Sequence, residues 1–167
     1  DLHDSRFAVL SNSGTSSLHV ALQTLKEIHG WADGDEVLVP SVTFVATVNV
    51  MLHCHLPPVL VDVDPVSWTM DIEEVKRAIS PRTKAIMPVH IYGHACDMDP
   101  LMEIAERNGL YIIEDCAESV GSRYRGALLG TFGHAACFSF FGNKTITTGE
   151  GGMILFRDSA VMERARM

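Results

Sequence analysis

Residues 7–40 read FAVLSNSGTSSLHVALQTLKEIHGWADGDEVLVP, and their apolar pattern indicates the fold class. The apolar run Phe7–Leu10 comes first, and the run Glu36–Val39 comes last. Between them, apolar residues recur at intervals of three and four, the period of a helix with one buried face: Leu18, Ala21, Leu22, Leu25 and Ile28. Gly30 is typical of the residue that ends such a helix. The stretch therefore predicts a strand, a helix and a second strand.

The same alternation continues along the chain, which is typical of α/β proteins. Further apolar runs predict five more strands: Val59–Val63, Ala85–Val89, Leu110–Ile113, Ala135–Phe140 and Met153–Phe156. Several of these runs are apolar almost throughout, as expected where helices cover both faces of a largely parallel sheet. We therefore expect an α/β fold in three layers, with a mostly parallel, seven-stranded sheet in the middle.

Two more helices have start and stop signals. Asp71 and Glu74 form a possible capping box ahead of an apolar helical stripe. Asp99 is expected to cap another helix, with Pro100 in its first turn and Gly109 at its end. The residues of this helix that should face inward are Leu101, Met102 and Ala105.

The bulk composition indicates one globular domain. The chain has 167 residues and is 47% hydrophobic, which is enough to bury a sizeable core. No internal repeat, low-complexity tract or linker divides it, so residues 1–167 are expected to form a single domain. Residues 158–167 look like a helix in mid-course with no closing element after it, and we expect the chain to be a fragment of a longer protein.

Charge and hydropathy argue against two kinds of partner. The chain has 13 basic and 21 acidic residues, a net charge of −8, and no basic stripe that could neutralise a phosphate backbone, so nucleic acid is not expected. No apolar run approaches the roughly 20 residues that span a bilayer, and the first residues do not resemble a signal peptide. We expect a soluble cytoplasmic protein that does not bind membranes.

Cysteine and histidine spacing does not indicate a metal site. The four cysteines lie apart, without a CxxC pattern, and are expected to be reduced and mostly buried: Cys54, Cys96, Cys116 and Cys137. Four histidines could in principle bind a metal, but no ligands accompany them at suitable spacing: His53, His55, His90 and His94. We expect helix-end and loop histidines and no metal.

Chemistry is expected where the parallel strands end at their carboxyl sides. The turn Ser11–Ser17 opens directly into the first helix, and its backbone N–H groups could hold a phosphate, although a simply capped helix is the commoner explanation of such a turn. The turn lacks a Walker lysine and the GxGxxG spacing, which argues against a nucleoside triphosphate or dinucleotide site. The strand that ends in Ile113 is followed by Glu114, Asp115 and Glu118, which are either functional acids or solvated loop acids.

Lys144 lies between an apolar strand and a turn with three glycines. A lysine in such a turn is usually a surface charge, but aromatic residues precede this one within five positions, so its amine could be partly desolvated and nucleophilic. A pyridoxal phosphate (PLP) site needs such a lysine, together with a carboxylate, a phosphate cradle and a flat side chain against the ring. Phe44 could be the flat side chain, or a core aromatic on an amphipathic helix.

The chain resembles the DegT/DnrJ/EryC1/StrS aminotransferases, which make amino sugars on nucleotide carriers. The resemblance covers nearly the whole chain and rests on ordered motifs, among them Ser13-Gly-Thr15, Thr43-Phe-Val-Ala-Thr47, Pro88-Val-His90, Ile113-Glu-Asp115, Phe138-Ser-Phe140 and Thr147-Thr-Gly-Glu-Gly-Gly152. It implies the large domain of an aspartate aminotransferase-like, PLP-dependent transferase. A smaller C-terminal domain and a homodimer are also implied for the complete protein.

The resemblance also implies a role for each matched residue. Lys144 would carry the cofactor in a Schiff base and move protons, and Asp115 would face the pyridine nitrogen. Phe44 would stack on the ring, and Glu118, a glutamine in many members, would lie near the ring hydroxyl. The phosphate would be held by Gly14, Thr15, Ser16 and Ser139.

The sequence of the segment around Lys144 is most similar to that of the branch that aminates C4 of GDP-4-keto-6-deoxymannose, with glutamate as the amino donor. A branch of sugar 3-dehydratases has histidine in place of the lysine, so Lys144 argues against it. Two alternatives stay open from the residues. One is a non-catalytic protein that binds PLP or a sugar nucleotide on the same fold, and the other is a nucleotide-binding α/β domain without PLP.

Overall fold

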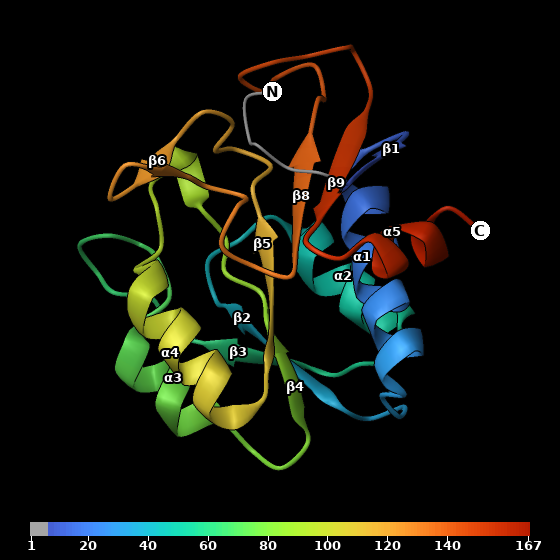
Figure 1. Cartoon of the computed structure of the whole chain (residues 1–167). Coiled ribbons are helices and arrows are strands. Elements are labelled where there is room, and N and C mark those ends of the chain that lie inside the picture. The colour runs from blue at the N-terminus through green and yellow to red at the C-terminus, as the bar shows by residue number, and fades with distance from the viewer. Residues whose placement is uncertain (1–6) are drawn as a thin grey trace.

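The computed structural model describes residues 7–167, and a seven-stranded sheet runs through its centre (Figure 1). The strand order is β1-β9-β8-β5-β4-β2-β3. Strand β9 is antiparallel to β1 and β8, and the other pairs are parallel. The strands are β1 (Phe7–Ser11), β2 (Glu36–Pro40), β3 (Pro58–Val61), β4 (Thr83–Ile86), β5 (Tyr111–Asp115), β8 (Ala135–Ser139) and β9 (Gly152–Phe156). The predicted mostly parallel sheet is confirmed, and each predicted apolar run contributes a strand.

Helices cover both faces of the sheet and complete three layers (Figure 1). One face carries α1 (Gly14–His29), α2 (Val45–His53) and α5 (Ser159–Ala165), which pack into one apolar cluster with the sheet. The other face carries α3 (Ile72–Ala78) and α4 (Met98–Asn108), which pack into a second cluster. Strands β2 and β8 are buried along their whole length, because both of their faces are covered.

The predicted end of α1 is confirmed, and the predicted capping box of α3 is confirmed in part. Gly30 ends α1 in the left-handed conformation, at a φ of 64°, and its N–H donates to the Lys26 carbonyl. The Asp71 carboxylate caps α3 by accepting from the N–H groups of Glu73 and Glu74. Only this half of the capping box forms, because the Asp71 N–H donates to the Asp62 carbonyl and the Glu74 side chain pairs with Arg77.

The prediction that Asp99 caps the next helix is wrong. Helix α4 begins at Met98, its N-cap residue is Asp97, and Asp99 lies within the first turn. The Asp97 carboxylate makes no cap hydrogen bond, because it accepts from the Tyr124 hydroxyl instead. The expected end at Gly109 is confirmed. Among the residues expected to face inward, Leu101 and Ala105 are buried and Met102 is half-buried.

A small hairpin was not predicted. Strands β6 (Arg123–Tyr124) and β7 (Ala127–Leu128) pair through a turn in which Arg125 and Gly126 both have positive φ, 47° and 89°. A short 3-10 turn, Ile91–Gly93, leads toward α4. All four cysteines are free and buried, as predicted. None of the helices in residues 7–167 is long and apolar enough to cross a membrane.

Candidate functional site

A cavity of about 410 Å³ opens at the carboxyl ends of the parallel strands. This volume is in the range of small-molecule sites, roughly 300–1,000 Å³. Of the residues predicted for the site, all but Ser16 line the cavity: Gly14, Thr15, Phe44, Asp115, Glu118, Ser139 and Lys144. Segments far apart in the sequence therefore meet at one place, as expected for residues that follow the carboxyl ends of neighbouring parallel strands.

The start of α1 forms one wall of the cavity. Ser13 is the N-cap residue, and its Oγ accepts the Ser16 N–H at 3.1 Å. The Ser16 hydroxyl pairs with the Ser13 hydroxyl at 3.0 Å, so it belongs to the cap rather than to the cavity lining. The N–H groups of Gly14 and Thr15 are in the first turn and have no acceptor within their own helix. Together with the helix dipole, they favour an anion at this wall.

Two glycines let this wall approach the sheet. A Cβ on Gly14 would lie 2.6 Å from the Ser139 Cβ and 3.0 Å from its Oγ, so only glycine allows the helix start to touch the end of β8. A Cβ on Gly152 would lie 2.4 Å from the Ser13 carbonyl oxygen. The hydroxyl of Ser139 is thereby held beside the first turn of α1, where an anion would bind.

Asp115 is the last residue of β5 and is only 4% exposed. One carboxylate oxygen accepts the Thr47 hydroxyl at 2.9 Å, and the other accepts the Ala117 N–H at 3.1 Å. Burial raises the pKa of this carboxyl group, and the two hydrogen bonds and the nearby Lys144 charge only partly oppose that rise. A cationic group in the cavity would therefore stabilise the charged form of Asp115.

Lys144 turns inward from an otherwise exposed segment. Its side chain is 18% exposed, and its Nζ lies 3.4 Å from Oε1 of Glu118. The second oxygen of Glu118 accepts the Tyr92 N–H at 2.7 Å. Glu118 thus holds the amine from one side and is itself fixed from the other. The interpretation of Lys144 as a plain surface charge does not fit this burial and pairing.

Phe44 is the N-cap residue of α2, lines the cavity and is 71% exposed. The alternative that it is a core aromatic is wrong, because its ring lies outside both apolar clusters. A large apolar ring with this exposure beside a cavity favours a flat ligand that would cover it.

Sequence reasoning missed several cavity residues, including Thr43, Thr47 and Asn143. The hydroxyls of Thr43 and Thr47 lie 2.8 Å apart, although Thr43 precedes the N-cap residue of α2 and only Thr47 lies within the helix. His90 was considered only for metal binding, yet it lines the cavity and contacts the buried Glu114. Its partner Glu114 lies in β5, 24 positions further along the chain, so no local sequence pattern indicated the pair.

One group in residues 7–167 has the composition of a metal site, although none was expected: His90, Glu114 and Cys116. Their donor atoms lie within 4.8 Å of one another, and all three residues are buried. The Glu114 carboxylate already accepts hydrogen bonds from three backbone N–H groups.

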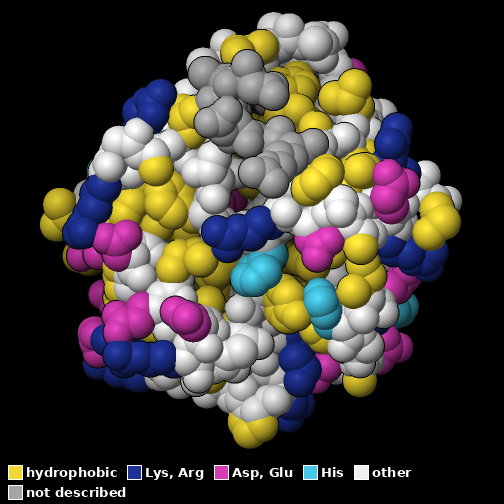
Figure 2. All heavy atoms as spheres, in the orientation of Figure 1, with side chains coloured by type: hydrophobic (Ala, Val, Ile, Leu, Met, Phe, Trp, Pro, Cys, Tyr) yellow, Lys and Arg dark blue, Asp and Glu magenta, His cyan; other side chains and the backbone are white. Residues whose placement is uncertain are grey.

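On the face seen in Figure 2, acidic and basic side chains are interspersed, without a continuous basic surface.

A sequence model described as the DegT/DnrJ/EryC1/StrS aminotransferase family matches residues 1–167. GDP-perosamine synthase of Caulobacter vibrioides is 50% identical over 162 residues, which is 97% of this chain and 43% of that protein. The chain thus spans less than half the length of this relative.

Solved structures of similar proteins have the same fold. The S. venezuelae protein DesV, solved in complex with a ketimine intermediate, is 42% identical and superposes with a TM-score of 0.93 over 99% of this chain and 44% of its own. The PLP form of Spr1654 from Streptococcus pneumoniae, described as a sugar aminotransferase, is 28% identical and superposes with a TM-score of 0.89 over 99% of this chain and 46% of its own.

Proposed function

Because the chain belongs to the DegT/DnrJ/EryC1/StrS aminotransferase family, we propose that it forms the PLP-binding large domain of a sugar-nucleotide aminotransferase. The complete protein would move an amino group from glutamate to a keto sugar nucleotide. The observation that carries the proposal is the meeting of Lys144, Asp115 and the start of α1 around one cavity.

The residues around the cavity fit PLP in their chemistry. The first turn of α1 and the Ser139 hydroxyl offer donors for a phosphate, in a cradle that a Cβ on Gly14 would fill. Among residues 7–167, no cationic side chain lies within hydrogen-bonding distance of the buried Asp115 carboxylate, and a protonated pyridine nitrogen would supply such a partner. Phe44 presents a large exposed ring to the same space. When bound, PLP supplies an electron sink for the carbon that loses a proton.

Each of the side chains around the cavity would have a separate role. The Lys144 amine would hold the cofactor covalently and then carry a proton at its Nζ during transfer. Glu118, fixed by the Tyr92 N–H, would orient that amine. Asp115 would keep its negative charge against the ring nitrogen, with Thr47 and Ala117 setting its direction. Phe44 would cover the ring and exclude water.

The identity of the sugar substrate is a more specific proposal than the reaction class, and it rests on similarity to GDP-perosamine synthase. We propose GDP-4-keto-6-deoxymannose as the acceptor, with amination at C4. In the complete protein, a homodimer is expected to build the part of the pocket that recognises the sugar and nucleotide.

The test uses the complete natural protein loaded with PLP. Glutamate should convert the absorption band of the bound cofactor, and the keto sugar nucleotide should restore it and yield an amino sugar. The Lys144→Arg variant, which keeps a cation opposite Glu118, should lose about 10²–10⁴-fold in rate or more.

A panel of keto sugar nucleotides would decide the acceptor. Turnover with another sugar but not with GDP-4-keto-6-deoxymannose would refute the substrate proposal alone. A bound cofactor whose spectrum glutamate leaves unchanged would instead indicate a binding or regulatory protein. Unchanged PLP binding without Lys144 would refute the covalent role of Lys144, and a natural protein that binds a nucleotide but no PLP would be a nucleotide-binding domain.

A further inference from the structure

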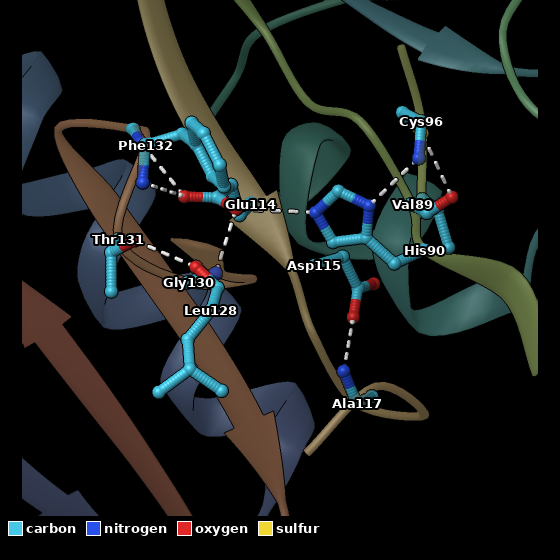
Figure 3. Close-up of polar contacts among 11 residues, drawn as sticks. Val89, His90, Cys96, Glu114, Asp115, Ala117, Leu128, Gly130, Thr131 and Phe132 are labelled. Atoms are coloured by element: carbon cyan, nitrogen blue, oxygen red, sulfur yellow. Dashed lines mark hydrogen bonds and ion pairs between the residues drawn. The ribbon is translucent and has the colours of Figure 1, made fainter. Parts of the chain in front are cut away.

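Glu114 and Asp115 are neighbours in β5 and point to opposite faces of the sheet. Figure 3 shows Glu114 turned toward Gly130 and Phe132, whereas Asp115 turns toward Ala117. Glu114 is completely buried. Its carboxylate nevertheless has a full set of partners: three backbone N–H groups and the ring of His90, which also lines the cavity.

Four donors converge on the Glu114 carboxylate. Oε1 accepts the N–H groups of Phe132 at 2.9 Å and Gly133 at 2.7 Å. Oε2 accepts the Gly130 N–H at 2.8 Å and lies 3.2 Å from Nε2 of His90. Backbone N–H groups can only donate, so a carboxylate satisfies this position and an amide does not: its NH₂ group would face another donor.

The tautomer of His90 follows from its other nitrogen. The Cys96 N–H donates to Nδ1 at 3.1 Å, so Nδ1 is an acceptor and Nε2 carries the proton that points at Glu114. The ring is fully buried, and the Cys116 thiol is a further polar neighbour of it.

This cluster is not built for a cation. Backbone N–H groups surround the Glu114 oxygens and would repel a metal ion. Burial also raises the pKa of the Cys116 thiol to about 11, which opposes the thiolate that a metal would need. The hydrogen bonds of Glu114 and His90 thus have a positional role.

The segment that carries His90 reaches the cavity at two points. Its backbone brackets Asp115: the His90 N–H donates to the Asp115 carbonyl at 3.1 Å, and the Asp115 N–H donates to the Pro88 carbonyl at 2.9 Å. Two residues after His90, the Tyr92 N–H holds Glu118, which contacts Lys144. The pair of Glu114 and His90 therefore ties this segment to β5 from beneath the site.

We propose that Glu114 and His90 are positioning residues that hold Asp115 where it meets the ring nitrogen of PLP. The inference rests on the proposed function, because it requires PLP in the cavity. Neither residue needs to touch the cofactor through its side chain, since both act through the backbone of Asp115.

A double-mutant cycle on PLP dissociation constants tests the proposal in the complete protein. The variants are Glu114→Gln, Asp115→Asn and the double variant, each titrated with PLP and followed by absorption. Glu114→Gln should raise the dissociation constant about tenfold in the natural background and less than about twofold when Asp115 is already asparagine. Equal fold-changes in both backgrounds would overturn the proposal.

Glu36→Gln is the matched control for lost stability. Glu36 is also a buried carboxylate on a sheet strand, but it contacts Ser80 and Arg82 at the opposite end of the sheet. This variant should lower the melting temperature of the cofactor-free protein and leave the PLP dissociation constant unchanged. If the PLP dissociation constant of Glu36→Gln rose as much as that of Glu114→Gln, the loss of PLP affinity would be explained by lower protein stability alone, and the proposal would be wrong.

Two histidine variants keep the proposal testable if Glu114→Gln does not fold. His90→Gln can still donate to Glu114, whereas His90→Asn can replace only the Nδ1 contact with Cys96. His90→Asn should therefore weaken PLP binding more than His90→Gln, and the reverse order would contradict the inference. If the natural protein does not bind PLP at all, the proposed function fails and this inference falls with it. If PLP binds but the cycle is additive, only this inference fails.

Discussion

Asp115 is a carboxylate that the fold buries beside a cavity, and this has a measurable consequence for stability. Burial raises its pKa in the folded protein above the unfolded value. The folded state therefore holds the proton more tightly than the unfolded state. The stabilisation from this group is complete below the unfolded pKa, about 4, and is lost as the pH rises through the folded pKa.

We predict opposite effects of Asp115→Asn on stability and on PLP affinity. Asparagine can accept the Ala117 N–H and donate to the Thr47 hydroxyl without a buried charge. The cofactor-free variant should thus melt at a higher temperature than the natural protein at neutral pH, and the difference should shrink toward about pH 4. Its PLP affinity should fall. Calorimetry over this pH range checks the first effect, and a variant that melts lower at neutral pH would contradict it.

The residues that sequence reasoning found and missed differ in a physical way. Lys144 and Asp115 carry unusual chemistry at strand ends, so their residue type and position sufficed to suggest them. Thr47 and His90 matter through partners that lie 68 and 24 positions away, respectively. No local pattern encodes such contacts, because the fold alone creates them.

At the scale of elements, the first turn of α1 depends on glycine in β9. A Cβ on Gly152 would approach the Ser13 carbonyl oxygen to 2.4 Å and the Ser17 hydroxyl oxygen to 2.6 Å. Backbone cannot yield as a flexible side chain can, so Gly152→Ala should move the turn away from the sheet. We expect a loss of about 1–3 kcal/mol in the free energy of unfolding and weaker binding of PLP.

Gly142→Ala is the matched control, because the nearest atom to its added Cβ would be the Gly149 carbonyl oxygen at 3.9 Å. It should leave both quantities nearly unchanged. Denaturant unfolding and a PLP titration measure the two effects. If both alanine variants behaved alike, the contact between Gly152 and the turn would have no energetic role.

Most elements were predictable because each has a local signal of adequate length. Apolar runs of four or more residues predicted the strands of the main sheet. Strands β6 and β7 have only two residues each and were missed. The start of α4 was predicted at Asp99, but its N-cap residue is Asp97, whose carboxylate accepts from the Tyr124 hydroxyl, and no local sequence pattern encodes this distant contact.

At the scale of the whole molecule, apolar side chains remain exposed around the cavity. Phe44 and Phe141 line it and are 71% and 48% exposed, and Ile146 of the lysine turn is 52% exposed. These surfaces fit the expectation that the complete protein is a homodimer whose partner covers the site. We predict that residues 1–167 alone bind PLP more weakly than the complete protein and transaminate poorly or not at all. Equal turnover by the two proteins would refute this.

Lys144 and Asp115 are proposed to bind one PLP molecule in one cavity. Borohydride reduction of the PLP-loaded complete protein, followed by digestion and mass spectrometry, locates the covalent attachment. A reduced pyridoxyl group is expected on the peptide that contains Lys144, and none in the Lys144→Arg variant. Attachment at a different lysine, or none in the natural protein, would contradict this proposal.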